Sequence, residues 1–339
     1  MEGWTDAAVR AGSAGAARPR LVLVHGIGNI HDPDEARREW TGALARGAVA
    51  AGHSAAAGAL RDGSGADVVF AGYSDLFQPR RGTAQGAGEG EADGETEEEA
   101  LLTLRLIGEL VDAQIAEGVD DDSRAILEQA RDRIRRARDG SAPQGPGEWV
   151  RVSLNVLTTL LELRGLRRAG QWTRAVALRG PFAQVSRYLS REPAKNPLDR
   201  LVRARVTTAL GTGPAVVVAH SLGSVVALEA LHESMARVPL LVTIGSPLGM
   251  RTVVWPHLTP RPPVTPESVD RWLNFWDRDD VIVSRASLSG IGTNSRRVGP
   301  ESFRVDSDGL LVHSAVKYLE QPAVAGPVVE ALDIVRDVV

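Results

Sequence analysis

The residues best suited to chemistry lie in Ala219-His220-Ser221-Leu222-Gly223, between a run of valines and a helical pattern. A nucleophilic serine on an α/β sheet needs a sharp turn between strand and helix that exposes its hydroxyl. Because that turn is strained, the residues two places either side must be small, as Ala219 and Gly223 are. The helix starting near Leu222 would aim free backbone N–H groups at the reacting atom. The segment predicts Ser221 as a nucleophile and the Leu222 amide as an oxyanion donor; a buried serine in a tight turn is the alternative.

Two other serines occur in similar surroundings, but the pattern around each is weaker. Gly52-His53-Ser54-Ala55 follows an alanine-rich helical segment rather than a strand. Gly245-Ser246-Pro247 does follow a strand-like run, yet Pro247 lacks the N–H that an oxyanion donor at that place would supply. We interpret the second segment as the turn leaving its strand.

A serine hydroxyl needs a base, and histidine is the side chain whose basicity suits neutral pH. In enzymes built on this type of sheet the order along the chain is serine, then acid, then histidine. Three histidines follow Ser221. His232 lies deep in the helix after the serine, and His257 precedes the fifth strand-like run, so no acid at a strand end comes before it. His313 follows the last run and is the predicted base; a surface histidine at a helix start is the alternative.

The acid must orient the imidazole and stabilise its charged form. Trp276-Asp277-Arg278-Asp279-Asp280 follows the fifth strand-like run and offers three aspartates. Asp277 is nearest the strand, whereas Asp280 is deeper in the loop and precedes an apolar pair that could bury it. Its place in the loop favours Asp280, with Asp277 as the alternative acid and Asp279 as the least favoured of the three.

The first strand-like run ends in a glycine-rich turn, His25-Gly26-Ile27-Gly28. Gly26 and Gly28 would let the backbone fold over the place of a tetrahedral oxygen, so the N–H of Ile27 could join that of Leu222 as a second donor. Nearby, His31, Asp32 and Asp34 could suggest a metal site. A polar pattern of this kind more often caps a helix, and we predict no metal.

The elements that must position these residues follow an α/β pattern. Continuous apolar runs indicate strands covered by helices on both faces, so we expect a mostly parallel sheet of about six strands. The predicted strands are 21–24, 67–71, 216–219, 240–244, 273–276 and 302–305. The predicted helices around them are 34–51, 197–210, 222–236 and 324–338.

More than 100 residues separate the second and third strands, far more than a normal connection in such a sheet. This span opens with an acidic, glycine-rich stretch, Arg81 to Glu99, which predicts a mobile loop. Helical patterns follow, and the third of them is apolar on two sides. We therefore divide the chain into a tail, a core in two pieces, and an acidic loop with a helical cap: 1–19, 20–78 with 197–339, and 79–196. The predicted cap helices are 96–117, 121–138, 148–168 and 171–190.

Composition excludes several classes of protein. The 39 basic and 43 acidic residues give a net charge of −4, so no global positive field would hold nucleic acid or anionic lipid. The chain has no cysteine, which excludes disulfides, thiol nucleophiles and cysteine metal sites. Neither a secretory signal nor an apolar run of membrane-spanning length is present. We expect a cytoplasmic protein without a transmembrane segment and without a cofactor.

The sequence resembles the α/β-hydrolase superfamily, within it lipase- and esterase-like proteins. The resemblance rests on the HG turn at His25, the AHSLG segment at Ser221, the loop Asn274-Phe275-Trp276-Asp277-Arg278-Asp279-Asp280, and the late His313. It covers about 20–75, 197–250 and 270–339, and not the helical cap. It implies an α/β-hydrolase fold and a triad of Ser221, Asp280 and His313, since the second aspartate of that loop is the family's triad acid. Ala219 replaces the first glycine of the family's serine turn.

We therefore expect a serine hydrolase that cleaves a carboxylic ester with an acyl or lipid-like group, the cap acting as a lid. An acyltransferase or an amidase would use the same triad. A binding module without catalytic activity on the same fold is the alternative from a different class.

Overall fold

The computed structural model describes residues 18–26, 28, 30–77, 96–139, 146–163, 171–190, 197–280, 282–284, 287–307 and 312–338. Within them, a six-stranded sheet has the order β2-β1-β3-β4-β5-β6, and every neighbouring pair is parallel. The strands are β1 (Arg20–Val24), β2 (Asp67–Ala71), β3 (Ala215–His220), β4 (Leu241–Ile244), β5 (Trp272–Asp277) and β6 (Pro300–Val305). The predicted parallel α/β sheet is confirmed, each strand lying within two residues of its predicted bounds.

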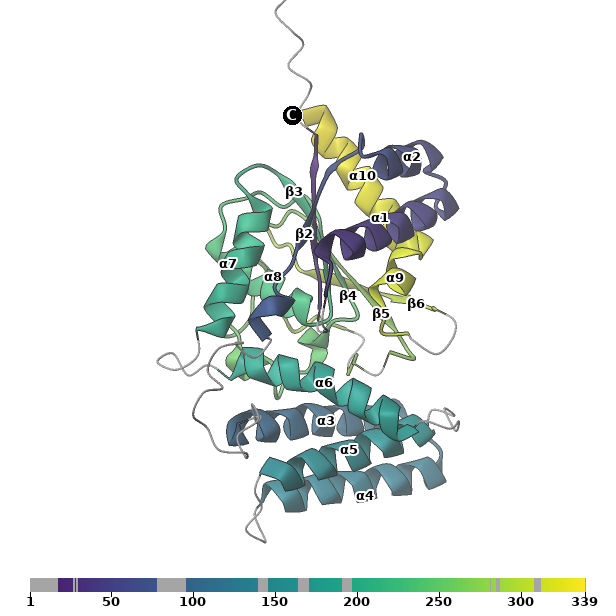
Figure 1. Cartoon of the computed structure of the whole chain (residues 1–339), viewed down its shortest axis with the longest axis vertical. Coiled ribbons are helices and arrows are strands. Elements are labelled where there is room, and N and C mark those ends of the chain that lie inside the picture. The colour runs from purple at the N-terminus through teal and green to yellow at the C-terminus, as the bar shows by residue number, and fades with distance from the viewer. Residues whose placement is uncertain are drawn as a thin grey trace, which may run out of the picture.

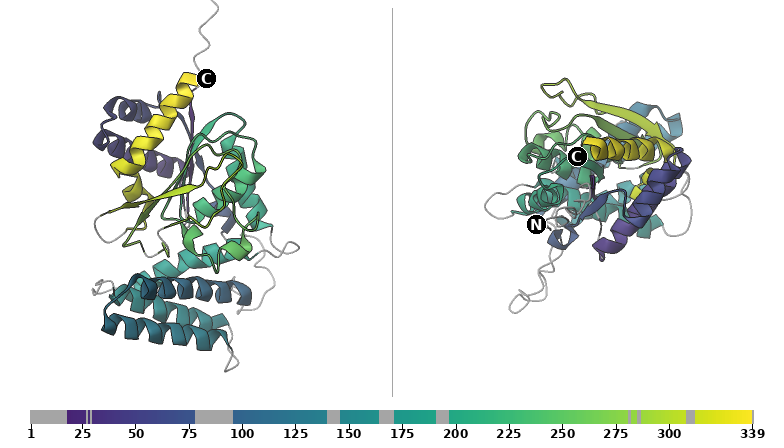
Figure 2. Two further views of the ribbon diagram at one scale, coloured as in Figure 1. Left: turned by 180° about the vertical axis from the view of Figure 1, so that it is seen from behind. Right: turned by 90° about the horizontal axis from the view of Figure 1, so that it is seen from above.

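Alternate residues of the strands enter two separate apolar layers because side chains of a strand point to opposite faces. Leu21 and Leu23 pack toward one layer of helices, whereas Val22 and Val24 belong to the other layer. The first layer comprises α1 (Pro33–Ala50), α2 (Ser54–Asp62), α9 (Ala315–Leu319) and α10 (Pro322–Val338), and the second α7 (Leu198–Leu210) and α8 (Leu222–Glu233). Figures 1 and 2 show the two layers on opposite sides of the sheet.

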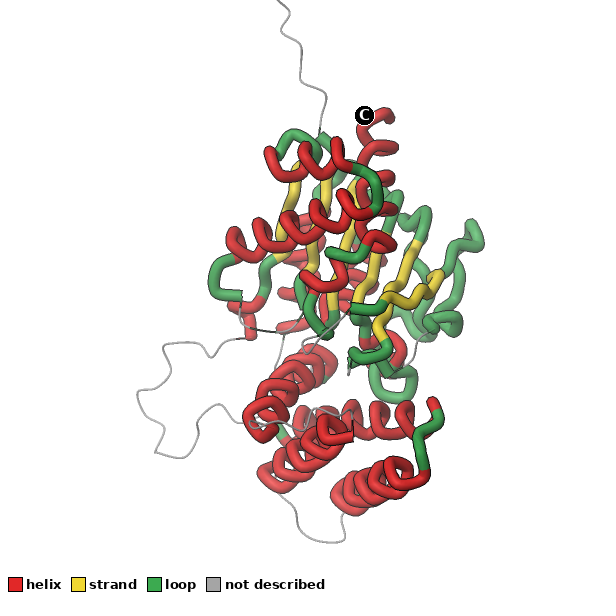
Figure 3. The backbone as a smooth tube through the Cα atoms, turned by 90° about the vertical axis from the view of Figure 1, so that its right-hand side faces the viewer, coloured by secondary structure: helices red, strands yellow, loops and turns green. Residues whose placement is uncertain are grey.

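The helical insertion consists of four helices beyond the carboxyl ends of the strands (Figures 1 and 3). They are α3 (Glu97–Glu117), α4 (Asp121–Arg138), α5 (Pro146–Leu163) and α6 (Gln171–Leu189). Helix α6 lies nearest the sheet and α4 farthest from it (Figure 1). Helix α5 packs against the other three, and its residues Val156, Leu157 and Leu160 are buried, as its two apolar stripes suggested.

The prediction of a loop over 81–99 is wrong for the last three residues, which are helical. The first turn of α3 contains Glu97, Glu98 and Glu99. The helix dipole stabilises negative charge at this end of a helix. Thr96 and Glu99 also cap this helix reciprocally, each accepting a hydrogen bond from the other's backbone N–H. The part of the stretch before Thr96 lies outside the described residues, as does the predicted tail up to residue 17.

Side chains fasten the insertion to the core at several places. The buried carboxylate of Glu109 on α3 accepts hydrogen bonds from the N–H and hydroxyl of Thr252 and from the N–H of Val253. Arg187 on α6 donates to the carbonyl oxygen of Phe77. Phe77 ends the short helix η1 (Ser74–Phe77), the last described segment before the insertion.

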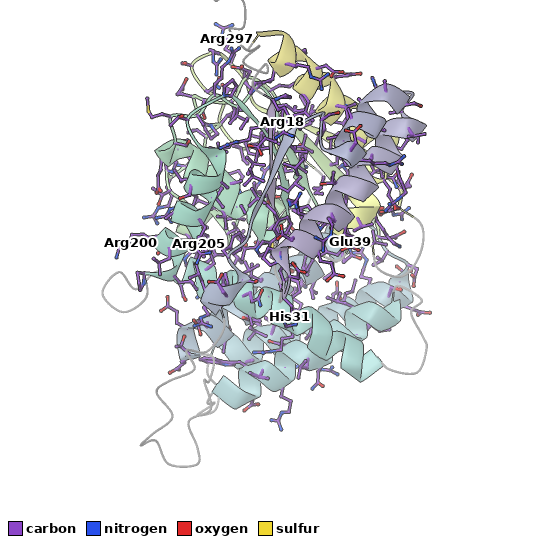
Figure 4. The ribbon with its side chains drawn as sticks, turned by 45° about the horizontal axis from the view of Figure 1, so that its top comes forward. Arg18, His31, Glu39, Arg200, Arg205 and Arg297 are labelled. Atoms are coloured by element: carbon purple, nitrogen blue, oxygen red, sulfur yellow. The ribbon has the colours of Figure 1, made fainter. Side chains whose placement is uncertain are left out.

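The chain leaves the core at η1 and returns to it at α7, and these two segments are joined directly. Arg205 on α7 forms an ion pair with Asp75, at 3.1 Å, and a hydrogen bond with the carbonyl oxygen of Gly72. Figure 4 shows Arg205 on this side of the core. Both ends of the insertion are therefore attached at one border of the sheet.

Among the described residues, no helix combines the length and the apolar character needed to cross a membrane.

Candidate active site

Ser221 stands alone between the last residue of β3 and the first of α8, in the turn that the sequence predicted. Its backbone has φ 54° and ψ −130°, a left-handed conformation that is costly for any residue other than glycine. Because α8 begins at Leu222, the first amides of this helix have no partner within it. Gly223 is required because a Cβ there would overlap the carbonyl oxygens of Val24 and His25.

The structure brings Ser221, His313 and Asp280 together although they are far apart in the sequence. Nε2 of His313 lies 2.9 Å from Oγ of Ser221, and Nδ1 lies 2.8 and 2.9 Å from the two carboxylate oxygens of Asp280. The carboxylate of Asp280 and the residue Ser221 are both fully buried, while the His313 side chain is 15% exposed. The three groups form one unbroken hydrogen-bonded chain.

Asp280 is held ionised by its neighbours. Oδ1 accepts a hydrogen bond from the N–H of Ile282 at 2.9 Å, and Oδ2 accepts one from the hydroxyl of Tyr318 at 2.8 Å. Burial alone would raise the pKa of Asp280, but the imidazole of His313 and these hydrogen bonds outweigh it and hold the pKa below its usual range. A carboxylate in this state can orient an imidazole and stabilise its positive charge.

Asp277, the alternative acid, has a different place. Its carboxylate accepts hydrogen bonds from the N–H of Asp279 and from the N–H and hydroxyl of Ser307, which fixes the loops after β5 and β6. None of its hydrogen bonds within the described residues reaches His313. The structure thus places Asp280, and not Asp277, against the histidine.

The glycine-rich turn after β1 lies against the serine. A Cβ on Gly26 would be 2.5 Å from that of Ser221, so only glycine permits this approach. Nδ1 of His25 is 2.7 Å from the carbonyl oxygen of Gly26, and Nε2 is 3.1 Å from the N–H of Tyr73. Since the carbonyl can only accept and the amide only donate, the ring must carry its proton on Nδ1. Burial lowers the pKa of His25 to about 4, so it is neutral and structural.

The predicted oxyanion donor Ile27 lies outside the described residues. Gly28, beside it, has φ 119°, a conformation that favours glycine. Its N–H donates to Oε1 of Gln184 on α6, at 2.8 Å. The insertion therefore reaches the turn that would hold the oxyanion, a contact that no sequence pattern indicated.

Further residues around the serine were missed from sequence. The hydroxyl of Ser224 donates to the carbonyl oxygen of Ser221 at 2.6 Å, and lies 2.6 Å from the hydroxyl of Ser246. Gly245 has φ 55°, and a Cβ there would be 2.9 Å from Oδ2 of Asp280. The turn Gly245-Ser246-Pro247 leaves β4, as predicted, and it also makes room for the acid. A glycine directly after a strand, at the edge where the other site residues lie, was the available signal.

The ring of His220 lies against that of His313, the predicted base, and the two ring centres are 4.7 Å apart. Burial, followed by the positive charge of His313, lowers the pKa of His220 well below its usual value. The ring is therefore neutral, and it adds no charge next to His313.

The other candidate groups have structural roles. Asp32 caps α1 by accepting hydrogen bonds from the N–H groups of Asp34 and Glu35, which is the predicted alternative to a metal site. His31 is exposed at the border between the core and the insertion (Figure 4). Nε2 of His232 is 3.0 Å from the carbonyl oxygen of Val264. Within the described part of the chain, no group of three His, Asp or Glu side chains is arranged to hold a metal ion.

No protein-family model matches the chain, and no curated protein or solved structure is detectably similar to it. The site itself consists of a buried serine whose hydroxyl is hydrogen-bonded to an imidazole, and the imidazole is oriented by a buried carboxylate.

Proposed function

We propose that this protein is a serine hydrolase of the α/β-hydrolase type, which cleaves carboxylic esters through an acyl-enzyme. The observation that carries the proposal is the hydrogen-bonded chain from Asp280 through His313 to Ser221, on a strand-to-helix turn of strained geometry. Strain and burial of this kind cost stability, and proteins commonly retain them at functional sites.

The reaction follows from the positions of these atoms. Oγ of Ser221 attacks the ester carbonyl carbon while its proton passes to Nε2 of His313. The carbon–oxygen bond to the alcohol then breaks, and the same proton passes to the departing oxygen. Water, activated by His313, repeats the sequence on the acyl-enzyme and releases the acid. Asp280 keeps Nδ1 protonated throughout and stabilises the imidazolium.

The negative charge on the carbonyl oxygen needs backbone donors. The amide of Leu222, at the start of α8, points its N–H out of the helix end, where the helix dipole also favours negative charge. We assign the second donor to Ile27, because the turn that contains it lies against Ser221 at Gly26. Together they would form the oxyanion hole.

The surroundings favour an ester with an apolar acyl group. Leu222, next to the nucleophile, belongs to the same large apolar cluster as Phe182 and Val185 on α6. Ser221 has no exposed surface. The insertion thus acts as a lid that excludes water from the reaction and offers apolar contacts to the acyl chain.

Labelling with a serine-directed fluorophosphonate tests the proposal. Wild-type protein should react, and the Ser221→Ala variant should not. Ser54→Ala is the matched control, because Ser54 also follows a histidine directly but is exposed at the start of α2, away from the proposed triad. Labelling that survives Ser221→Ala would refute the role of Ser221. Failure of the folded wild-type protein to react would favour a binding module without catalytic activity.

A series of p-nitrophenyl esters of increasing acyl length tests the substrate class. We expect kcat/KM to rise from acetyl to octanoyl, because each buried CH₂ contributes about 0.8 kcal/mol. A preference for acetyl over octanoyl esters would contradict an apolar acyl site.

A further inference from the structure

Tyr318 touches the loop that carries the predicted acid at two points. Its hydroxyl donates to Oδ2 of Asp280 at 2.8 Å and accepts a hydrogen bond from the N–H of Asp277 at 3.0 Å. The residue is completely buried. The phenol therefore joins the backbone of the last residue of β5 to the side chain of Asp280, three positions later.

The position of Tyr318 follows from that of His313. Tyr318 follows His313 by five positions in the chain and belongs to the short helix α9. The same carboxylate is thus held from two sides by one segment, through Nδ1 of His313 and the hydroxyl of Tyr318. If the segment shifts, the base and the group that holds the acid move together, so the distance between base and acid is preserved.

The phenol can act only as a neutral group here. Burial, together with the charge of Asp280, raises the pKa of Tyr318 far above its ordinary value, so it remains protonated and donates to the carboxylate. A hydrogen bond to a charged group in a dry site is about twice as strong as one between neutral groups. This bond takes up part of the negative charge on Asp280, which His313 would otherwise feel in full.

We propose that Tyr318 is a positioning residue of the triad: its hydroxyl fixes the Asp280 carboxylate in the orientation that serves His313 and moderates its negative charge. This inference rests on the proposed function of the site. It goes beyond that function because it assigns a role in catalysis to a side chain that touches neither the serine nor the base.

The chain contains a matched control. Tyr188 on α6 is also fully buried, and its hydroxyl donates to the buried carboxylate of Glu229 at 2.7 Å. Tyr318→Phe and Tyr188→Phe therefore each remove one phenolic hydroxyl from one buried carboxylate. Only the first carboxylate belongs to the proposed site, so a loss of activity caused by removing a buried phenolic hydroxyl as such should appear in both variants.

The first measurement is the pH profile of ester hydrolysis. With p-nitrophenyl butyrate we expect Tyr318→Phe to lower kcat about tenfold with little change in KM. The acid limb of kcat/KM should move to higher pH, because an Asp280 carboxylate without its phenol partner holds the imidazole proton more firmly. Among the described residues, the titratable side chains recorded against His313 are Asp280 and His220, and Tyr318→Phe changes neither of them. Tyr188→Phe should keep the wild-type kcat and acid limb.

The second measurement needs no turnover. In the Ser221→Ala background, the imidazole signals of His313 are followed by NMR as a function of pH, with and without Tyr318→Phe. A shift of the titration midpoint to higher pH supports the proposal even if no ester proves to be a substrate, so its outcome is separate from that of the proposed function. An unchanged midpoint, or a Tyr318→Phe variant with the kcat and acid limb of the wild type, would overturn it.

Discussion

Exchange of each of two buried aspartates, Asp277 at the end of β5 and Asp280 in the loop after it, for asparagine tests which of them is the acid of the proposed triad. Asp280 accepts hydrogen bonds from His313, Ile282 and Tyr318, and Asp277 from Asp279 and Ser307. In both cases an asparagine keeps one acceptor oxygen and places an NH₂ group where the second oxygen was. Each variant should therefore lose a similar free energy of unfolding, about 2 kcal/mol.

Turnover should separate the two variants sharply. Asp280→Asn presents an amide to Nδ1 of His313, which favours the wrong tautomer, and in triads of this kind that loss is about 10⁴-fold in kcat. Asp277→Asn leaves the contact between Asp280 and His313 in place, so its kcat should stay within about fivefold of wild type. Urea unfolding gives the stability of each variant, and hydrolysis of p-nitrophenyl butyrate is measured where both are folded. If Asp277→Asn loses as much turnover as Asp280→Asn, our placement of the acid is wrong.

Three more predictions concern the parts that support the site. Gly245→Ala should lower the free energy of unfolding by about 1–2 kcal/mol, because position 245 has a positive φ that alanine adopts at a cost. It should also slow fluorophosphonate labelling, because the new methyl group displaces the Asp280 carboxylate. Labelling at the wild-type rate would contradict this. Glu109→Ala should lower the free energy of unfolding by about 2 kcal/mol, because it leaves the buried N–H of Val253 without its acceptor. A loss under about 0.5 kcal/mol in urea unfolding would argue against this attachment of α3 to the core. His25 has a pKa of about 4 in the folded protein against 6.5 for a free side chain, so the unfolded chain takes up the proton at a higher pH than the folded one. The free energy of unfolding should therefore fall by up to about 3 kcal/mol as the pH drops from about 6.5 to about 4. The same pH dependence of the free energy of unfolding in wild type and His25→Gln, measured with urea, would refute this.

The central strands could be predicted because both of their faces are buried. Runs such as Val216-Val217-Val218 are apolar at every position. A helix with one exposed face would instead carry polar residues at regular intervals. Helix α2 was missed because its apolar side chains are mostly alanines, which give little contrast between faces. The five-residue helix α9 is too short to show a period at all.

For the candidate site, the order of residues along the chain was more informative than their spacing. The turn around Ser221 and the late position of His313 follow from the geometry of a parallel sheet, whose strands all end at one edge. The aspartate could not be chosen from the loop alone, because the loop's path depends on Tyr318 and Ser307, which come later in the chain. Gln184 was beyond reach of any pattern, since 156 residues separate it from Gly28.

The single border at which the insertion is attached has an evolutionary consequence. Because Asp75 and Arg205 join the two segments that flank the insertion, a change in the length of the insertion need not move these segments apart. An insertion whose two flanking segments are joined in this way can change in length while the close approach of Gly26 and Gly223 to their neighbours is kept.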